Sequence, residues 1–405
     1  MEKIKIGQEF LQLFNAQGYQ AYLVGGTVRD FLLGHAIKDL DVTTSATPKQ
    51  VVTLFPDAIP TGIKYGTVTV KFKGQYIEVT TFRSESDYLD YRRPSVVKYS
   101  ESLEEDLSRR DFTINALAMD ADGGIFDYHE GRKALTNRII CTVGVPQERF
   151  REDPLRMLRA IRFIAQLGFQ IEENSWTELK NSAPFLRHVA VERVKMEMDR
   201  ILDSPYVEEG IEMLFASGLL EWLPRIALTE LGTLDGKQLS RLIGQSENII
   251  TRWYLLLHLL NADNFTFLLG SLSFSQKERK GIEERAAVYQ LLSKDLTTQT
   301  LTKCLISYEK ESIAEAIKIL LGGDQESAVF WLEQLEMIDQ QLTVRSVKDL
   351  AIDGNQLLSK LKLRPGVMVG KILDELLQRV IFQGLANKKS TLLAEAARIR
   401  GELSE

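Results

Sequence analysis

Cysteine and histidine are scarce in this chain of 405 residues, which contains two cysteines and four histidines. Cys141 and Cys304 lie far apart, and neither has a neighbour at the spacing that a zinc site requires. The sequence therefore predicts no disulfide framework and no structural zinc. Such sparse cysteine favours a reducing compartment, so we expect a cytoplasmic location. No pattern of Ser, Cys and His indicates a nucleophilic catalytic triad.

Long hydrophobic runs are absent as well. A membrane-spanning helix needs roughly 18 or more consecutive apolar residues, whereas the richest stretch, Trp253–Leu260, is short and contains a histidine. The first residues, Met1–Ile6, lack the apolar segment of a signal peptide. We therefore expect no membrane partner. The chain is long enough to form more than one hydrophobic core.

An excess of positive charge is also missing, because the formal net charge is −6. This value argues at first against a nucleic-acid partner. Net charge, however, describes solubility and not the local field. An acidic chain can still bind RNA through a localised basic stripe, and such binding would depend strongly on salt.

The first part of the chain, up to about residue 140, mixes strand and helix patterns. Residues 84–97 are polar and charged without a period, which predicts a mobile loop. A short helix is predicted at Pro48–Phe55, with Thr47 as its N-cap. The predicted strands are Ala21–Val24, Leu40–Thr43, Gly66–Phe72, Gln75–Phe82 and Ala116–Met119, with a hairpin turn at Lys73-Gly74.

Helical periodicity dominates from Pro146 onward, where strand patterns nearly vanish. One helix is predicted from Pro154 to a stop at Gly168. Breaks are expected near Ser204-Pro205 and in two later polar segments, Gly232–Gly236 and Asp295–Thr300. The sequence thus predicts an α/β head followed by an all-helical part more than twice as long.

Two carboxylates at the start of the second predicted strand are the most informative feature. Asp39 and Asp41 are two residues apart, so both side chains lie on one face of a strand, opposite Leu40. Two such carboxylates repel each other unless a cation lies between them, and Mg²⁺ prefers oxygen ligands of this kind. Gly25-Gly26, just before a helix, offers backbone N–H groups to a phosphate. Taken alone, Asp-Leu-Asp is more often a solvated strand edge; together these features indicate metal-assisted phosphoryl or nucleotidyl transfer.

Glu78 is a candidate third carboxylate. It lies on the predicted strand Gln75–Phe82, facing away from Ile77 and Val79. It could complete a metal site or position an attacking hydroxyl. An exposed strand glutamate with no catalytic part is an equally good interpretation.

A second group of candidates follows at Arg109-Arg110-Asp111. The planar guanidinium groups suit phosphate oxygens. Asp111 and Asn115 are candidates for ribose hydroxyls or phosphate oxygens. The alternative is that the two arginines only pair with acidic residues 104–106 at a helix end.

The third group begins at Glu152-Asp153. Asp153 and Arg156 are three residues apart, which predicts a shared helix face that Arg159 and Arg162 continue. An intrahelical salt-bridge ladder is one interpretation. The other is base recognition: a carboxylate accepts from the exocyclic amine of cytosine or adenine, a guanidinium donates to their acceptors, and guanine and uracil present a carbonyl instead.

Together these motifs resemble those of a known family. Gly25-Gly-x-Val-Arg-Asp followed by Asp39-x-Asp-x-x-Thr looks like the first motif of the DNA polymerase β-type nucleotidyltransferases, and more narrowly of the class II branch with the CCA-adding tRNA nucleotidyltransferases and bacterial poly(A) polymerases. Arg109–Ala118 resembles the second motif, and Glu152-Asp-x-x-Arg156 the amino-acid template. One departure is Ala134, where the family usually has Asp; Asp127 and Asn137 are the candidates to compensate.

The resemblance implies an α+β fold, with a polymerase β-like mixed-sheet head followed by an all-helical neck, body and tail. We expect the head at 1–140, the neck for base recognition at 141–204, the body at 205–298 and the tRNA-binding tail at 299–405. It implies stepwise, template-independent addition of C, C and A to the 3′ end of tRNA from CTP and ATP, with release of pyrophosphate. The partners are then the 3′ end and acceptor arm of tRNA, in a monomer or homodimer.

The resemblance also assigns roles to residues. Asp39 and Asp41 would hold Mg²⁺, with Glu78 as a further catalytic residue. The nucleotide-binding residues would be Gly25, Gly26, Arg29, Arg110, Asp111, Asn115, Asp153, Arg156, Arg159 and Arg162.

Three rival functions share these motifs or this scaffold. A bacterial poly(A) polymerase would carry a strongly basic extension, whereas this chain ends in Gly401-Glu-Leu-Ser-Glu405. A CC-adding enzyme would lack the loop element that adapts the pocket to ATP, and here Glu85–Pro94 is intact. A non-catalytic RNA-binding protein would have lost an aspartate of the pair, and both are present.

Overall fold

The computed structural model describes residues 2–63, 66–88, 94–100, 102–224, 236–260 and 269–402. These residues form two compact units. The first consists mainly of residues up to Gln245, and the second of Ser246–His258 and the residues from Phe274 onward. Each unit is described by itself.

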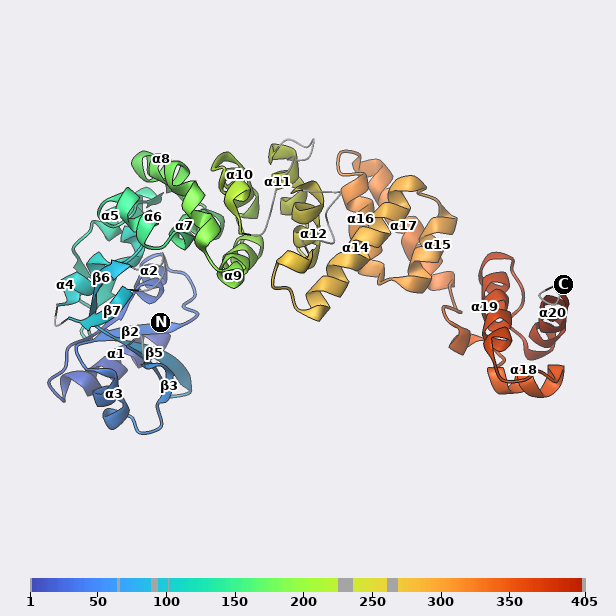
Figure 1. Ribbon diagram of the computed structural model, residues 1–405, viewed down its shortest axis with the longest axis horizontal. Coiled ribbons are helices and arrows are strands. Elements are labelled where there is room, and N and C mark those ends of the chain that lie inside the picture. The colour runs from blue at the N-terminus through green and yellow to red at the C-terminus, as the bar shows by residue number, and fades with distance from the viewer. Residues whose placement is uncertain are drawn as a thin grey trace. The chain divides into compact units, whose positions relative to one another are not determined.

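A mixed sheet of seven strands forms the centre of the head (Figure 1). The spatial order is β3-β4-β5-β2-β1-β8-β9. Only the pair β2–β5 is parallel, and the other neighbours are antiparallel. The strands are β1 Ala21–Val24, β2 Leu40–Thr44, β3 Ile59–Gly62, β4 Thr67–Phe72, β5 Gln75–Thr81, β8 Leu117–Met119 and β9 Ile125–Asp127.

Strand β1 contributes to the core on both faces of the sheet. Val24 packs on one face in a buried cluster that includes Phe82 and Leu107, with Tyr22 against it. Leu23 points to the opposite face, where helix α1 (Glu2–Asn15) covers the sheet. Because successive side chains alternate between faces, this burial fixes the register of the central strands.

Short-range patterns in the head confirm several sequence predictions. Helix α3 (Pro48–Leu54) begins with Thr47 in a capping box and with proline in its first turn. The β4–β5 turn holds Lys73 and Gly74 at φ values of 44° and 77°. Two left-handed residues make a turn whose twist matches that of the flanking strands, so the hairpin forms where the sequence predicted it.

The prediction of a periodless loop at residues 84–97 was wrong. Strands β6 (Arg83–Tyr88) and β7 (Pro94–Tyr99) pair as an antiparallel ribbon. This ribbon is a separate two-stranded sheet. Such a ribbon needs backbone hydrogen bonds but imposes no alternation of apolar residues, so no period marked it. Residues 89–93, which belong to the segment Glu85–Pro94, lie outside the described part of the chain.

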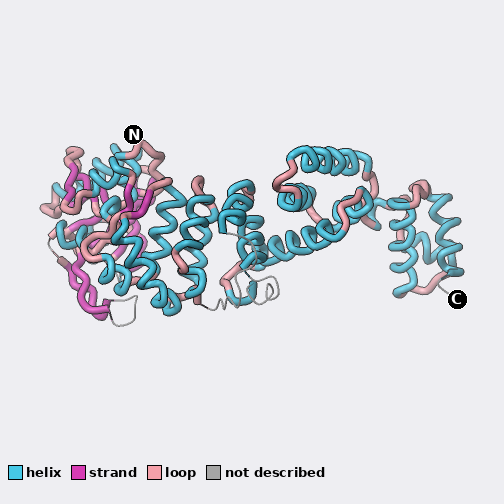
Figure 2. The backbone as a smooth tube through the Cα atoms, turned by 90° about the horizontal axis from the view of Figure 1, so that it is seen from above, coloured by secondary structure: helices cyan, strands magenta, loops and turns pink. Residues whose placement is uncertain are grey.

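Helices take over after β10 (Ile139–Ile140), which pairs with β11 (Gln170–Ile171). Helix α7 (Leu155–Leu167) packs against α9 (Val191–Leu202) and α10 (Val207–Ala216). Figure 2 shows helices beside the strands of the head. Helix α7 stops at Gly168, which has φ 64°, so the predicted stop is confirmed. The helices of the first unit after α1 and α3 are α2 Gly26–Leu32, α4 Leu103–Ser108, α5 Gly131–Asn137, α6 Pro146–Glu152, α7 Leu155–Leu167, α8 Glu173–Ser182, α9 Val191–Leu202, α10 Val207–Ala216 and α11 Gly236–Gln245.

Asp127 orders the segment where the sequence departs from the family. Its carboxylate accepts from the backbone N–H groups of Gly131 and Arg132 at 2.8 and 2.9 Å, at the start of α5. Ala134 is buried within that helix. Of the two compensating residues considered, Asp127 therefore holds this helix start.

Among its described residues, the second unit includes two hydrophobic cores. One joins Val288 and Leu292 to Leu301, Ile313 and Leu335. The expected boundary at residues 298 and 299 thus cuts through a single core, because the apolar faces on both sides of it pack together. The other core begins at Val344 and is built by α18–α20. The helices of this unit are α12 Ile249–Leu260, α14 Gln276–Lys294, α15 Thr298–Ser307, α16 Lys310–Leu320, α17 Gln325–Gln341, α18 Gly354–Leu361, α19 Val367–Phe382 and α20 Lys389–Glu402.

Among the described residues, no helix combines the length and the apolar composition needed to cross a bilayer.

Candidate active site

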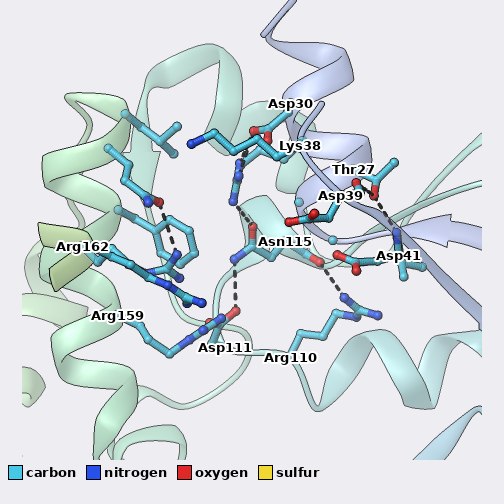
Figure 3. Close-up of a pocket in the computed structure, with 18 of the residues that line it drawn as sticks. Thr27, Asp30, Lys38, Asp39, Asp41, Arg110, Asp111, Asn115, Arg159 and Arg162 are labelled. Atoms are coloured by element: carbon cyan, nitrogen blue, oxygen red, sulfur yellow. Dashed lines mark hydrogen bonds and ion pairs between the residues drawn. The ribbon is translucent and has the colours of Figure 1, made fainter. Parts of the chain in front are cut away.

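A cavity of about 980 Å³ opens between the strands of the head and helices α7 and α9 (Figure 3). All thirteen residues named as site candidates from the sequence line it. Figure 3 shows Asp39 and Asp41 on the head side, with Arg159 and Arg162 opposite them on the helical side. The volume is in the range of pockets that bind nucleotide-sized ligands.

The three candidate carboxylates gather where β2 begins. Asp41 lies directly opposite Glu78 in the parallel pair β2–β5. Leu40 is buried on the other face of the sheet, and Asp39 precedes it with an exposed side chain. The alternation predicted from the sequence is therefore present, and it turns all three carboxylates toward the cavity.

The charge on Asp41 is unfavourable in this structure. Burial, the nearby negative charge of Glu78 and that of Asp39 raise the pKa of Asp41 to about 6. The guanidinium groups of Arg110 and Arg29 lower it, but they do not cancel the increase. A carboxyl group in this situation binds a proton more readily than usual, and a bound cation would relieve its unfavourable charge.

A divalent cation fits this donor set. Only carboxylate oxygens are offered, which suits Mg²⁺ better than zinc. Within the described residues, no three His, Cys, Asp or Glu side chains are grouped closely enough to enclose a metal by themselves. A site made of two carboxylates leaves coordination positions for substrate phosphates, which is how Mg²⁺ is commonly bound.

The raised pKa of Asp41 predicts a stability that depends on pH and on metal. In the metal-free protein the folded state binds more protons than the unfolded state between about pH 4 and 6, so stability decreases as pH rises through this window. Asp41→Asn removes the charge and should stabilise the metal-free protein at neutral pH by on the order of 1–3 kcal/mol. Thermal unfolding in EDTA measures this difference.

Titration with Mg²⁺ supplies the control. Mg²⁺ should raise the unfolding temperature of the parent protein at about pH 7.5 and much less at about pH 5, because protons then compete for Asp41. The Asp41→Asn variant should show little increase at either pH. An Asn variant less stable than the parent in EDTA would contradict the prediction.

The turn at Gly25-Gly26 needs glycine for its backbone conformation and because Arg110 lies close to it. Gly25 has φ 63°, and a Cβ placed there would lie 2.9 Å from Nη1 of Arg110. Its backbone N–H donates to the carbonyl of Leu117 at 3.2 Å. The prediction that both glycines offer amides to a phosphate is therefore wrong for Gly25; Gly26, the first residue of α2, remains a candidate.

A chain of polar contacts connects α2 to α7. Arg29 donates to Asp30 and to the side-chain oxygen of Asn115, both at 2.8 Å. Asn115 donates to Asp111 at 3.2 Å, and Arg159 donates to the other oxygen of Asp111 at 2.7 Å. Asp111 and Asn115 were expected to contact the nucleotide, but both are buried. In this structure Asn115 binds Arg29 and Asp111 binds Arg159.

Ionisation of Asp111 is secured by its neighbours. Burial by itself would raise the pKa of Asp111, but the positive charges of Arg159 and Arg156 outweigh that effect and hold the pKa well below its usual range. Asp111 therefore stays charged at neutral pH, where it pairs with Arg159 of α7.

Arg109 and Arg110 share one buried anchor. Both donate to Asp106, a fully buried carboxylate, at 2.7 and 3.3 Å. The alternative considered for these arginines was pairing with acidic residues 104–106 on the surface. The structure has this pairing with Asp106, but Asp106 is buried. Arg110 nevertheless also lines the cavity and acts on the charge of Asp41.

The expected arrangement of the base-reading pair needs a correction. Asp153 does not share a helix with Arg156, because α6 ends at Glu152 and Asp153 has an extended backbone before α7 begins. Its carboxylate accepts two hydrogen bonds from Arg193 on α9, at 3.1 and 2.7 Å. Pro154 explains the break, since a residue before proline avoids the helical conformation.

The arginines of α7 form no intrahelical ladder. Arg156 contacts Glu152, at 2.6 Å, and the carbonyl of Arg109, at 3.2 Å. Arg162 pairs with Glu197 of α9 at 2.8 Å. Burial and the neighbouring charge of Arg159 lower the pKa of Arg162 to about 10. Arg156 and Arg162 thus each have a partner outside the helix, although Arg162 also donates to Gln166 within it at 3.3 Å, and both side chains line the cavity.

Sequence reasoning missed two residues that line the cavity, Arg193 and Phe163, and Glu197, which pairs with Arg162. Arg193 orients Asp153, and Glu197 neutralises the arginine stripe of α7. The buried ring of Phe163 lies 5.3 Å from the guanidinium of Arg29 and 4.2 Å from that of Arg162. Both helix α9 residues are separated from the motifs by some 40 positions, and no local pattern marks them.

Family comparisons match most of the chain. Residues 21–141 match the Poly A polymerase head domain, and residues 168–228 match the probable RNA and SrmB-binding site of polymerase A. Residues 245–396 match the putative tRNA nucleotidyltransferase domain 2.

Full-length relatives and solved structures agree with these matches. The chain is 37% identical to the CCA-adding enzyme of Geobacillus sp. (strain WCH70), over 97% of both chains. It is 38% identical to that of Geobacillus kaustophilus (strain HTA426), over 93% of this chain and 92% of the relative. The Bacillus stearothermophilus CCA-adding enzyme in complex with CTP has 33% identity and a TM-score of 0.83, with 98% of each chain covered. The Thermotoga maritima CCA-adding enzyme, at 18% identity and a TM-score of 0.71 over 98% and 96%, shows the same fold.

Proposed function

The chain belongs to the family of CCA-adding enzymes, which are tRNA nucleotidyltransferases, and we propose that the cavity between its head and neck is the site of catalysis. The enzyme adds C, C and A to the 3′ end of tRNA, using CTP and ATP. The observation that carries the proposal for the site is the convergence of three carboxylates and a row of arginines on one cavity. The head match at residues 21–141 includes all three carboxylates.

In the proposed site, Asp39 and Asp41 hold a divalent metal. When bound, such a metal stabilises the charge that develops on the attacking oxygen and on the phosphate. Glu78, opposite Asp41, keeps the local charge negative and is the candidate for orienting the attacking 3′-hydroxyl. Arg110, held by Asp106, brings a positive charge to the same place.

The proposed ligands also favour one metal. We propose Mg²⁺, because the carboxylates supply hard oxygen ligands and leave positions for the triphosphate. We further propose a cytoplasmic location, because both cysteines are unpaired and the substrate is tRNA.

Base selection is assigned to the cavity wall formed by the neck. Asp153 accepts hydrogen bonds and would take the exocyclic amine that C and A share. Arg156 donates, and would meet the ring acceptors of the same bases. Guanine and uracil would place a carbonyl against the Asp153 carboxylate, which is repulsive. Arg193 fixes the direction of that carboxylate with two hydrogen bonds.

Extension of a tRNA that lacks its terminal CCA tests the function. CTP alone should give a product two nucleotides longer, ATP alone should give none, and the mixture should give three additions and then stop. A tRNA that already ends in CC should accept ATP.

The rival activities predict different products. A CC-adding enzyme would stop after two additions even with ATP present. A poly(A) polymerase would extend the RNA repeatedly with ATP alone. A non-catalytic RNA-binding protein would bind tRNA and extend nothing.

A further inference from the structure

Thr27 occupies a place in the site that the motifs do not explain. Its side chain is buried, with 1% of the residue exposed, in the first turn of α2. The hydroxyl donates to the backbone carbonyl of Asp39 at 3.1 Å and accepts from the backbone N–H of Asp41 at 2.9 Å. Figure 3 shows it directly beside these two residues. One oxygen atom therefore joins both aspartates.

The course of strand β1 explains why a hydroxyl is needed here. β1 pairs with β2 as far as Leu23 opposite Val42, and the chain turns away into α2 at Gly25. On its other side β2 pairs with β5 throughout, including Asp41 opposite Glu78. Asp39 and Asp41 therefore lie at the end of β2 where β1 no longer continues. At this end of β2, the Thr27 side chain makes the hydrogen bonds to the β2 backbone that a continued β1 would have made.

Few side chains can make this pair of contacts. A hydroxyl both donates and accepts at a single atom, so it can serve a carbonyl and an N–H at once. Valine has the same shape but would leave the carbonyl of Asp39 and the N–H of Asp41 without this partner. With Leu40 packed into the core on the opposite face, the hydroxyl completes the fixation of the segment from Asp39 to Asp41.

We propose that Thr27 is a positioning residue that sets the relative placement of the Asp39 and Asp41 carboxylates, and with it the affinity for the divalent metal. This inference rests on the proposed role of the two aspartates as metal ligands. Residues that orient metal ligands commonly change metal affinity by about 10- to 100-fold when they are replaced. Thr27 should therefore control the metal concentration that the enzyme requires, more than its maximal rate.

Three variants test the proposal: Thr27→Val, Thr27→Ser and Thr44→Val. Thr44 of β2 is the matched control, because its buried hydroxyl makes the same kind of contacts away from the two aspartates. It donates to the carbonyl of Gln20 at 2.6 Å and accepts from the N–H of Ala46 at 3.1 Å. The measurements are the Mg²⁺ concentration for half-maximal CTP incorporation, the maximal rate at saturating Mg²⁺, and the Kd of Mn²⁺ in the presence of CTP, followed by EPR.

Thr27→Val should raise the half-maximal Mg²⁺ concentration and the Mn²⁺ Kd by about tenfold or more, with much of the rate recovered at high Mg²⁺. Thr27→Ser should behave like the parent, because it keeps the hydroxyl. Thr44→Val should unfold at a lower temperature without changing the metal dependence.

Two results would overturn the inference: an unchanged metal dependence in Thr27→Val, or an equal shift in Thr44→Val, which would reduce the effect to lost stability. If Thr27→Val does not fold, a Thr27→Ser variant with the metal dependence shifted tenfold would also overturn it, since only the methyl group has been lost. These outcomes differ from failure of the proposed function, in which the parent itself would incorporate CTP independently of Mg²⁺ or not at all.

Discussion

Asp39→Ala and Asp41→Ala are each expected to abolish nucleotide incorporation while tRNA binding stays nearly intact. The two carboxylates share one strand face at the cavity, and Asp41 carries a charge that its surroundings disfavour unless a cation is present. Loss of a metal ligand should lower the rate by several orders of magnitude, because the metal provides the charge stabilisation. Single-turnover incorporation of CTP at saturating Mg²⁺ measures the rate, and fluorescence anisotropy measures tRNA binding.

The control for these variants is Asp122→Ala, which removes an exposed carboxylate of the head away from the cavity lining. It should retain the parent rate. Glu78→Gln separates the two interpretations of that residue: a rate reduced well below the parent value supports catalysis, and a parent-like rate supports an exposed strand glutamate. Near-normal turnover of Asp41→Ala would contradict the assignment of the whole site.

Asp153→Ala and Arg156→Ala should change which nucleotides are incorporated, and in different ways. Without the Asp153 carboxylate, the repulsion of a base carbonyl disappears, so the kcat/KM for UTP and GTP should rise relative to that for CTP and ATP. Without Arg156, CTP and ATP should both lose, because it donates to both. A bidentate contact of this kind is worth about 1–3 kcal/mol of discrimination, or roughly 5- to 150-fold in kcat/KM. The kcat/KM of all four nucleotides measures the effect.

Arg193 extends this test beyond the sequence motif. Arg193→Ala removes the two hydrogen bonds that orient Asp153, so its nucleotide selection should shift in the same direction as that of Asp153→Ala. Asp199→Ala is the control, since it breaks the Lys195 ion pair on the same helix, outside the cavity lining. Unchanged selection in Asp153→Ala and Arg156→Ala, with the fold intact, would mean that this wall of the cavity does not read the base.

Local sequence was sufficient wherever a short stretch carries its own physical signal. The N-cap at Thr47, the left-handed pair at Lys73-Gly74 and the stop at Gly168 each act within a few residues, and the structure has them as predicted. The same is true of Asp39 and Asp41, because alternation along one strand places them on one face.

Predictions failed where the structure of a segment depends on a partner that is distant in sequence. The β6–β7 ribbon forms by backbone pairing between two segments, and no sequence period marked it. The core joining Leu292 to Leu301 depends on how helices pack, which no break in composition reveals. The amide of Gly25 is used by Leu117, a residue on β8.

The sequence by itself determined the chemistry of this protein: which residue types are present, their spacing on single strands and helices, and hence the nucleotidyltransferase motifs. Only the tertiary structure decided what each charged group faces. The decisive contacts join different elements. Arg193 binds Asp153, and Asp111 binds both Asn115 and Arg159. Thr27 binds the backbone of two aspartates. The reason is physical: a residue's type sets which hydrogen bonds it can make, whereas its partner in a buried site is whatever the packing of strands and helices brings within about 3 Å.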